Sequence, residues 1–121
     1  MGANVSKAKR PKRRWIGITM PSHIQTKQDL MDAISSSRLS AYVIKPYDTY
    51  FSKTKEATHA CSFLQIHDDV GVAILCVLLK DYSNVRSFLE SENELQFMSI
   101  SSSGKLRLVR ERMGLSKPPR R

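Results

Sequence analysis

Positively charged residues gather at both ends of this 121-residue chain, and they are the side chains best suited to bind a partner. One cluster lies within residues 7–14, and the other lies within residues 105–121, where Glu111 is the one acid. The segment between them, residues 15–104, holds seven bases and ten acids. Like charges grouped in this way repel one another unless a polyanion compensates them. The pattern predicts two cationic ends that bind RNA, with solvated, solubilising tails as the alternative interpretation.

Side chains capable of catalysis or metal binding are scattered along the chain. His59 and Cys61 would share one face of a strand, but no second pair supplies further metal ligands. Asp68 and Asp69 are typical of a turn. The sequence has no glycine-rich phosphate loop and no nucleophile elbow. We therefore expect no catalytic residues and no bound metal, and we expect Cys61 and Cys76 to be buried thiols rather than a disulfide.

The apolar periodicity predicts the elements that would position the charged ends. Strands are expected at 15–20, 61–67, 70–79 and 95–100, while 41–58 stays unassigned. One helix should begin after Thr26 and another after residues 80–83. A basic helix is expected over 105–113, ended by Gly114.

These elements predict an α+β protein with an RRM-like, ferredoxin-like split β-α-β sandwich. Its antiparallel sheet would carry two packed helices, and a basic C-terminal helix would follow. The expected organisation is a flexible basic arm over 1–14, a single RNA-binding domain over 15–114 and a basic tail over 115–121.

Trp15 follows two arginines, so it could stack on an unpaired base; packing in the core is the alternative. The 70–79 strand lacks the surface aromatics of an RRM, which favours structured RNA over a single-stranded motif. The helix after residues 101–104 would offer backbone amides to phosphate. The predicted RNA-binding residues are Lys9, Arg10, Lys12, Arg13, Arg14, Trp15, Ser101, Ser103, Lys105, Arg107, Arg110 and Arg112. The predicted interface with a partner protein consists of Tyr42, Ile44, Tyr47, Tyr50 and Phe51.

Residues 1–6 fit the acceptor pattern for myristoylation at Gly2, and a polybasic stretch follows them. A lipid-anchored peripheral membrane protein is therefore an alternative function. The longest apolar run, residues 70–79, is too short to span a bilayer, and no secretory signal fits the N-terminus. We expect an intracellular protein that does not use the membrane.

Three stretches resemble the Pop-five type protein subunit of archaeal and eukaryotic ribonuclease P and ribonuclease MRP. Residues 12–18 and 29–34 resemble the family's first strand and first helix. Residues 71–76 with 85–89 resemble its central strand and the helix after it. Residues 99–107 resemble the closing strand and the loop that opens a basic helix, with Ser99 and Ser102 in place of two signature glycines. The resemblance covers roughly residues 12–112.

The resemblance implies a non-catalytic subunit that supports a catalytic RNA in removing the 5′ leader from precursor tRNA. It implies Mg²⁺ bound through the RNA, no cofactor on the protein itself, and a hetero-oligomer with a larger TIM-barrel-like subunit. The expected location is cytoplasmic in an archaeon and nuclear or nucleolar in a eukaryote. A ribosomal-type or other structured-RNA-binding protein is the alternative within the same fold class, and a stand-alone nuclease is the least favoured.

Overall fold

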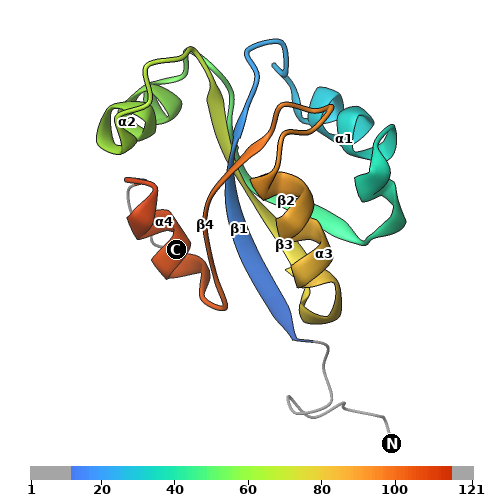
Figure 1. Cartoon of the computed structure of the whole chain (residues 1–121). Coiled ribbons are helices and arrows are strands. Elements are labelled where there is room, and N and C mark those ends of the chain that lie inside the picture. Colours follow the sequence, from blue (N-terminus) through green and yellow to red (C-terminus); the bar gives the residue numbers. More distant parts are fainter. Residues whose placement is uncertain (1–11, 116–121) are drawn as a thin grey trace, which may run out of the picture.

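The computed structural model describes residues 12–115. In this part of the chain a four-stranded antiparallel sheet lies between two pairs of helices (Figure 1). The strands are β1 (Arg13–Met20), β2 (Ile44–Tyr50), β3 (Gly71–Leu78) and β4 (Met98–Ser103), in the spatial order β2-β3-β1-β4. The helices are α1 (Lys27–Ser35), α2 (Lys55–Leu64), α3 (Leu79–Glu90) and α4 (Leu106–Arg112), with a short 3₁₀ helix at Arg38–Ala41. The predicted α+β class is confirmed, and the arrangement is compatible with a ferredoxin-like fold.

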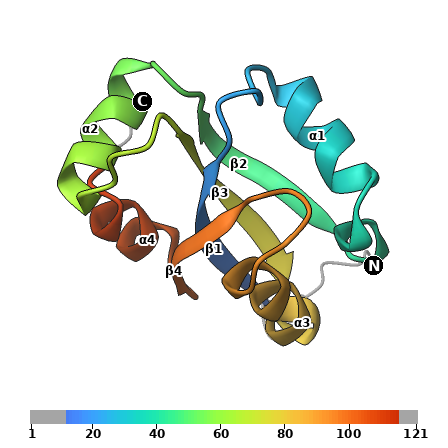
Figure 2. The same cartoon turned by 45° about the horizontal axis from the view of Figure 1, so that its top comes forward.

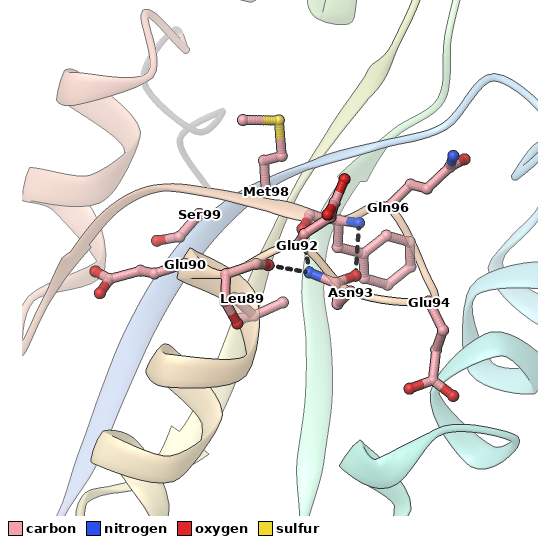
Figure 3. Close-up of a pocket in the computed structure, with 10 residues that line it drawn as sticks. Leu89, Glu90, Glu92, Asn93, Glu94, Gln96, Met98 and Ser99 are labelled. Carbon is pink, nitrogen blue, oxygen red and sulfur yellow. Dashed lines mark hydrogen bonds between the residues drawn. The ribbon is translucent and has the colours of Figure 1, made fainter.

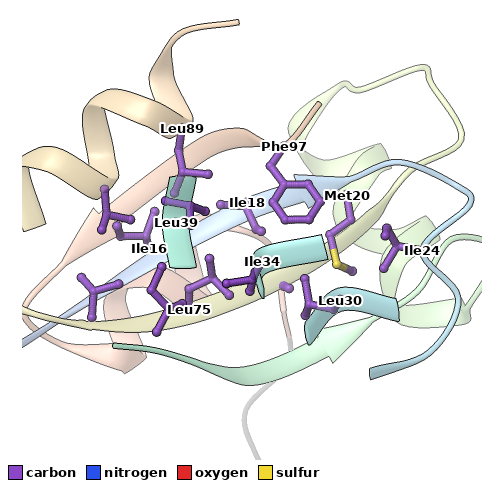
Figure 4. Close-up of a cluster of buried hydrophobic side chains, with 14 residues drawn as sticks. Ile16, Ile18, Met20, Ile24, Leu30, Ile34, Leu39, Leu75, Leu89 and Phe97 are labelled. Carbon is purple, nitrogen blue, oxygen red and sulfur yellow. The ribbon is translucent and has the colours of Figure 1, made fainter. Parts of the chain in front are cut away.

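Helices α1 and α3 cover one face of the sheet, while α2 and α4 lie on the other (Figure 2). On the α1/α3 face, alternate residues of the two central strands point into a large apolar cluster (Figure 4). It contains Ile16, Ile18 and Met20 from β1, Ala73, Leu75 and Val77 from β3, and Leu30, Ile34, Val85, Leu89 and Phe97 from the surrounding helices and loop. Both central strands are therefore fixed by their neighbours and by this core.

A smaller apolar cluster lies between the sheet and the α2/α4 pair. It joins Ala57 and Ala60 of α2 to Val72 and Ile74 of β3 and to Val109, Met113 and Leu115 at the C-terminal end. Gly17 of β1 lies below α4, and a Cβ there would approach Met113 Sδ to 2.4 Å. The absence of a side chain at residue 17 lets α4 sit close to the sheet.

The predicted strand at 61–67 is wrong, because residues 55–64 form helix α2. Thr54 caps this helix, since its Oγ1 accepts a hydrogen bond from the Ala57 amide at 3.1 Å. Ala57, Ala60 and Cys61 lie at helical spacing and are buried. Cys61 and Phe63 are apolar and two residues apart, a spacing that resembles the alternation of a strand. They do not share a buried face, because Cys61 is buried and Phe63 is 58% exposed.

The second strand is β2, which lies in the segment left unassigned. Its residues contain Pro46, and the register with β3 shifts between Pro46 and Thr49. Because β2 is at the edge of the sheet, the missing proline N–H breaks no central ladder. The proline and the bulge conceal a strand that the sequence pattern does not reveal.

Several boundaries differ from the prediction by a few residues. Arg13 and Arg14 begin β1 instead of belonging to an arm, and the Leu79 amide donates to the Lys12 carbonyl at 2.8 Å. Helix α3 follows β3 directly, so no side chain caps it. Strand β4 covers 98–103 rather than 95–100, because Phe97 turns into the core.

The start of α1 is confirmed at Thr26, where Thr26 and Asp29 form a reciprocal capping box. Cys61 and Cys76 are buried free thiols, as predicted. Among residues 12–115 the structure contains no helix with the length and apolar character needed to cross a bilayer.

Candidate nucleic-acid interface

Pairing of β1 with β4 joins two predicted RNA-binding segments that are about 90 residues apart in the sequence. Trp15 is the register partner of Ser103, Ile16 of Ser102 and Gly17 of Ser101. The contact continues past the strands, since a Cβ on Gly104 would lie 2.6 Å from Arg14 Nη1. Residues 13–15, at the C-terminal end of the N-terminal cationic cluster, therefore lie beside the part of β4 that leads into α4.

The N-terminal cations divide between the two faces of the sheet, because alternate strand residues point in opposite directions. Arg13 is exposed and shares the α2/α4 face with Trp15. Arg14 points to the α3 side, where its guanidinium carbon lies 5.8 Å from the centre of the Tyr82 ring. Arg86 of α3 approaches the same ring, also at 5.8 Å. Two arginines thus converge on one aromatic ring at this edge of the sheet.

Tyr82 connects this pair of arginines to β4. The Tyr82 hydroxyl and the Ser102 hydroxyl are 2.6 Å apart and share a hydrogen bond. Arg112 of α4 donates to the Ser102 carbonyl at 3.2 Å and to the Ser101 hydroxyl at 3.4 Å. Strand β4 is therefore bordered by cations from β1, α3 and α4.

Helix α4 adds exposed positive charge on the outer side. Lys105 precedes it, and its amide donates to Ser103 Oγ at 3.1 Å. Arg107 is 70% exposed and forms an ion pair with Glu111 at 2.9 Å. A helix of seven residues has a weak dipole, so the side-chain charges rather than the helix end supply its attraction for anions.

Arg110 is the exception among the predicted RNA-binding residues of α4. Its side chain is only 7% exposed, and Nη1 lies 2.5 Å from Asp48 Oδ2 of β2. Burial opposes the charged form, but hydrogen bonds with Tyr50 and Asp48 outweigh it and raise the pKa of Arg110 above its ordinary value. Arg110 therefore links α4 to β2 inside the molecule instead of presenting a cation at the surface.

The other predicted residues are distributed as follows. Lys12 is exposed at the start of the described segment. Lys9 and Arg10 lie outside the described residues. Eight of the predicted residues line the β1/β4 edge or α4 with their side chains at least partly accessible: Arg13, Arg14, Trp15, Ser101, Ser103, Lys105, Arg107 and Arg112.

The residues of the predicted protein-partner surface differ in burial: Ile44 is buried, while Tyr42, Tyr50 and Phe51 are partly exposed. Ile44 is 7% exposed and belongs to the large core, and Tyr42 and Phe51 pack against that core. Tyr50 packs against the smaller cluster. Four of the five therefore contribute to the packing of the two apolar clusters. Of the five, Tyr47 is exposed, at 56%.

Tyr47 also contacts Trp15, which the sequence did not predict. The two ring centres are 4.8 Å apart and the ring planes meet at 73° in an edge-to-face arrangement. Lys45, two residues earlier on β2, is exposed beside them. Val43, Lys45 and Tyr47 are exposed and alternate with buried or partly buried residues. This alternation would place Lys45 and Tyr47 on one face of a strand, but it can be used only once the strand at 44–50 is known.

A hollow of about 760 Å³ lies at the opposite end of α3 (Figure 3). Asn93 organises its loop, since the amide nitrogen donates to the carbonyls of Phe88 and Phe97 at 3.1 and 2.8 Å. The lining includes three glutamates, Glu90, Glu92 and Glu94, whose charge repels a polyanion. Within the described part of the chain, no group of three histidine, cysteine or acidic side chains is placed to hold a metal ion.

The β1/β4 edge therefore gathers guanidinium groups and serine hydroxyls from β1, α3, β4 and α4. Hydroxyls and guanidinium groups of this kind bind phosphate and sugar oxygens, which position a nucleic acid without choosing its sequence. Comparisons with protein-family models, with curated proteins and with solved structures find no match to this chain.

Proposed function

We propose that this protein is a non-catalytic RNA-binding subunit of ribonuclease P, which supports the catalytic RNA during 5′-leader removal from precursor tRNA. The observation that carries the proposal is the pairing of β1 with β4. It places Arg13, Arg14 and Trp15 beside Ser101–Ser103 and the exposed cations of α4. These segments belong to two of the stretches that carry the resemblance to the Pop-five type subunit, residues 12–18 and 99–107.

The strand order β2-β3-β1-β4 supports a split βαβ plan in which β1-α1-β2 and β3-α3-β4 form the two halves. Helix α2 is then an insertion between the halves, and α4 is the C-terminal basic helix of the proposal. In this plan the RNA meets the Ser101–Ser103 end of β4, whereas Met98 and Ser99 at the other end of that strand line the acidic hollow. Mg²⁺ is held by the RNA, and the larger TIM-barrel-like subunit is the proposed protein partner.

The physical role of the subunit is neutralisation of phosphate charge. A cation placed against a phosphate releases condensed counterions, so each contact adds about 0.7–0.9 to the dependence of log K on log salt. Lys105, Arg107 and Arg112 are the three exposed cations at or within α4. Closer approach of RNA segments becomes possible at lower Mg²⁺ because the protein screens their repulsion.

The test uses a variant with all three of these residues changed to glutamine: Lys105→Gln, Arg107→Gln and Arg112→Gln. The matched control changes three exposed lysines on α1, α2 and the turn before α2: Lys27→Gln, Lys53→Gln and Lys55→Gln. Both variants lose the same formal charge. We expect the first to reduce the salt slope of RNA binding by about two to three, and to raise the Mg²⁺ needed for precursor-tRNA cleavage in the reconstituted enzyme. Equal behaviour of the two variants would contradict the proposed surface.

A ribosomal-type or other structured-RNA-binding protein remains the second candidate, because the same cations would serve it. Sequencing the RNA that co-purifies with the full chain separates the two. Enrichment of ribonuclease P RNA supports the proposal, whereas enrichment of ribosomal RNA replaces it with the second candidate.

A further inference from the structure

We propose that the uncovered end of the α2/α4 sheet face binds an unpaired nucleotide of RNA, which stacks on the Trp15–Tyr47 pair while Arg13 and Lys45 contact its phosphates. This inference rests on the proposed RNA-binding function and adds the class of RNA element that the protein recognises. The sequence offered stacking on Trp15 as one alternative and favoured structured RNA; the structure adds Tyr47, Arg13 and Lys45 on the same face.

The register of the sheet places these side chains on one face. Cys76 of β3 is the partner of Trp15 on one side and of Lys45 on the other. Directly paired residues in a sheet project to the same side, and Arg13 follows by alternation along β1. Burial raises the pKa of the Cys76 thiol, while the charges of Arg13 and Lys45 act in the opposite direction. Both cations are therefore close to that sulfur.

The helices leave this end of the face open. Helix α4 rests on Gly17 through Met113 and Val109, and α2 covers Val72 and Ile74. Trp15 lies two residues nearer the start of β1 than Gly17, on the same face, and it packs against the smaller cluster while staying partly exposed. Its ring is thus held in place by the fold before any ligand arrives, which lowers the cost of binding.

The composition of the surface favours a nucleotide over a protein segment. An aromatic pair is available for stacking, because Tyr47 is 56% exposed. A cation lies two residues before each ring, Arg13 on β1 and Lys45 on β2. The carboxylate next to Tyr47 in the sequence, Asp48, is ion-paired with Arg110 and so does not offset them. Aromatic rings next to positive charges are the features with which proteins hold single-stranded nucleic acid.

The surface is also continuous with the proposed phosphate-binding edge. Trp15 is paired with Ser103, and Lys105 follows two residues later. An RNA chain whose phosphates lie along β4 and α4 can therefore place one unstacked base on the Trp15–Tyr47 pair. Such bases occur in loops and bulges of folded RNA.

The experiment titrates the full chain with a short oligouridine and follows tryptophan fluorescence, since Trp15 is the only tryptophan in the sequence. We expect the emission to be quenched on binding. Tyr47→Ala should weaken oligouridine binding about tenfold, the effect of losing one stacked base. Tyr47→Phe should keep the affinity, because the ring rather than the hydroxyl stacks.

The matched control is Phe63→Ala, which removes an aromatic ring of similar exposure, 58%, from the outside of α2. It should leave oligouridine binding unchanged. Unchanged emission at saturating oligouridine, or equal affinities for Tyr47→Ala and Phe63→Ala, would overturn the inference. Salt-dependent binding of ribonuclease P RNA, measured in parallel with the glutamine variants, reports separately on the proposed function.

Discussion

Arg110 and Arg107 lie three residues apart on one short helix, and we predict that their loss has opposite consequences. Arg110→Gln should destabilise the fold and leave the salt slope of RNA binding unchanged. Arg107→Gln should leave stability nearly unchanged and reduce that slope by about one. The difference follows from burial, because the Arg110 side chain is 7% exposed and that of Arg107 is 70% exposed.

The magnitude for Arg110 comes from the charge that its removal leaves behind. Removing one partner of a buried ion pair costs about 3–5 kcal/mol. Asp48 is 24% exposed and keeps some contact with water, so we expect the lower end, about 3 kcal/mol. For a chain of this length that is a fall in melting temperature of about 10 °C. The Arg107–Glu111 pair is on the surface at (i, i+4) spacing and should contribute about 0.3–0.5 kcal/mol.

Urea unfolding and RNA-binding titrations at several salt concentrations measure the two effects on the same preparations. The double variant Arg110→Gln with Asp48→Asn is the control, because it removes both charges and should recover part of the lost stability. The reasoning fails if Arg110→Gln lowers the salt slope with no loss of stability, since Arg110 would then be a surface cation.

Two further predictions concern the fold. Gly71→Ala should lower the free energy of unfolding by about 1–3 kcal/mol in urea unfolding, because its Cβ would lie 2.8 Å from the Tyr50 carbonyl oxygen and 3.0 Å from the Phe51 Cα, which are backbone atoms. Gly104→Ala is the control and should lower it clearly less, because its Cβ meets the movable end of the Arg14 side chain. Equal losses of unfolding free energy in the two variants would contradict this account. Hydrogen bonds from the Gln25 and Thr26 amides lower the pKa of Asp29. The capping box should therefore stabilise the fold at neutral pH, and this contribution should be lost as the pH falls through that lowered pKa. Asp29→Asn should therefore reduce the loss of stability at acid pH, measured as melting temperature against pH between neutral and acid solution. Asp32→Asn on the same helix is the control and should keep the wild-type pH dependence. Identical pH dependence for Asp29→Asn and the wild type would refute the role given to Asp29.

The sequence predicts an element correctly where a single local pattern determines it. The Thr26–Asp29 cap needs four residues, and the buried run of β3 reflects a strand covered on both faces, so both could be predicted. The edge strand β2 could not, because Pro46 and the bulge interrupt its alternation. Helix α2 was missed because its buried face is made of small residues, Ala57 and Ala60, which carry a weak apolar signal.

The candidate site, too, could be predicted from the sequence only in part. The cations at each end of the described chain could be listed from the sequence, but their meeting depends on the β1–β4 register. Arg110 differs from Arg107 only through Asp48, which is 62 residues away. A partial signal exists, because Arg110 lies four residues after Leu106 and borders the apolar stripe of α4. Tyr47 and Lys45 join Trp15 only once β2 is known.

Strand β1 is the first of the four strands to be synthesised, yet it lies in the middle of the sheet. Its two sides can form hydrogen bonds only after β3 and β4 have been made. During translation the segment 12–15 therefore emerges long before its neighbours at 101–105 exist. The assembled cationic edge is absent from the nascent chain until the last strand has been added. Under the proposed function, RNA would bind only molecules whose sheet is complete and would add its binding free energy to their folding equilibrium.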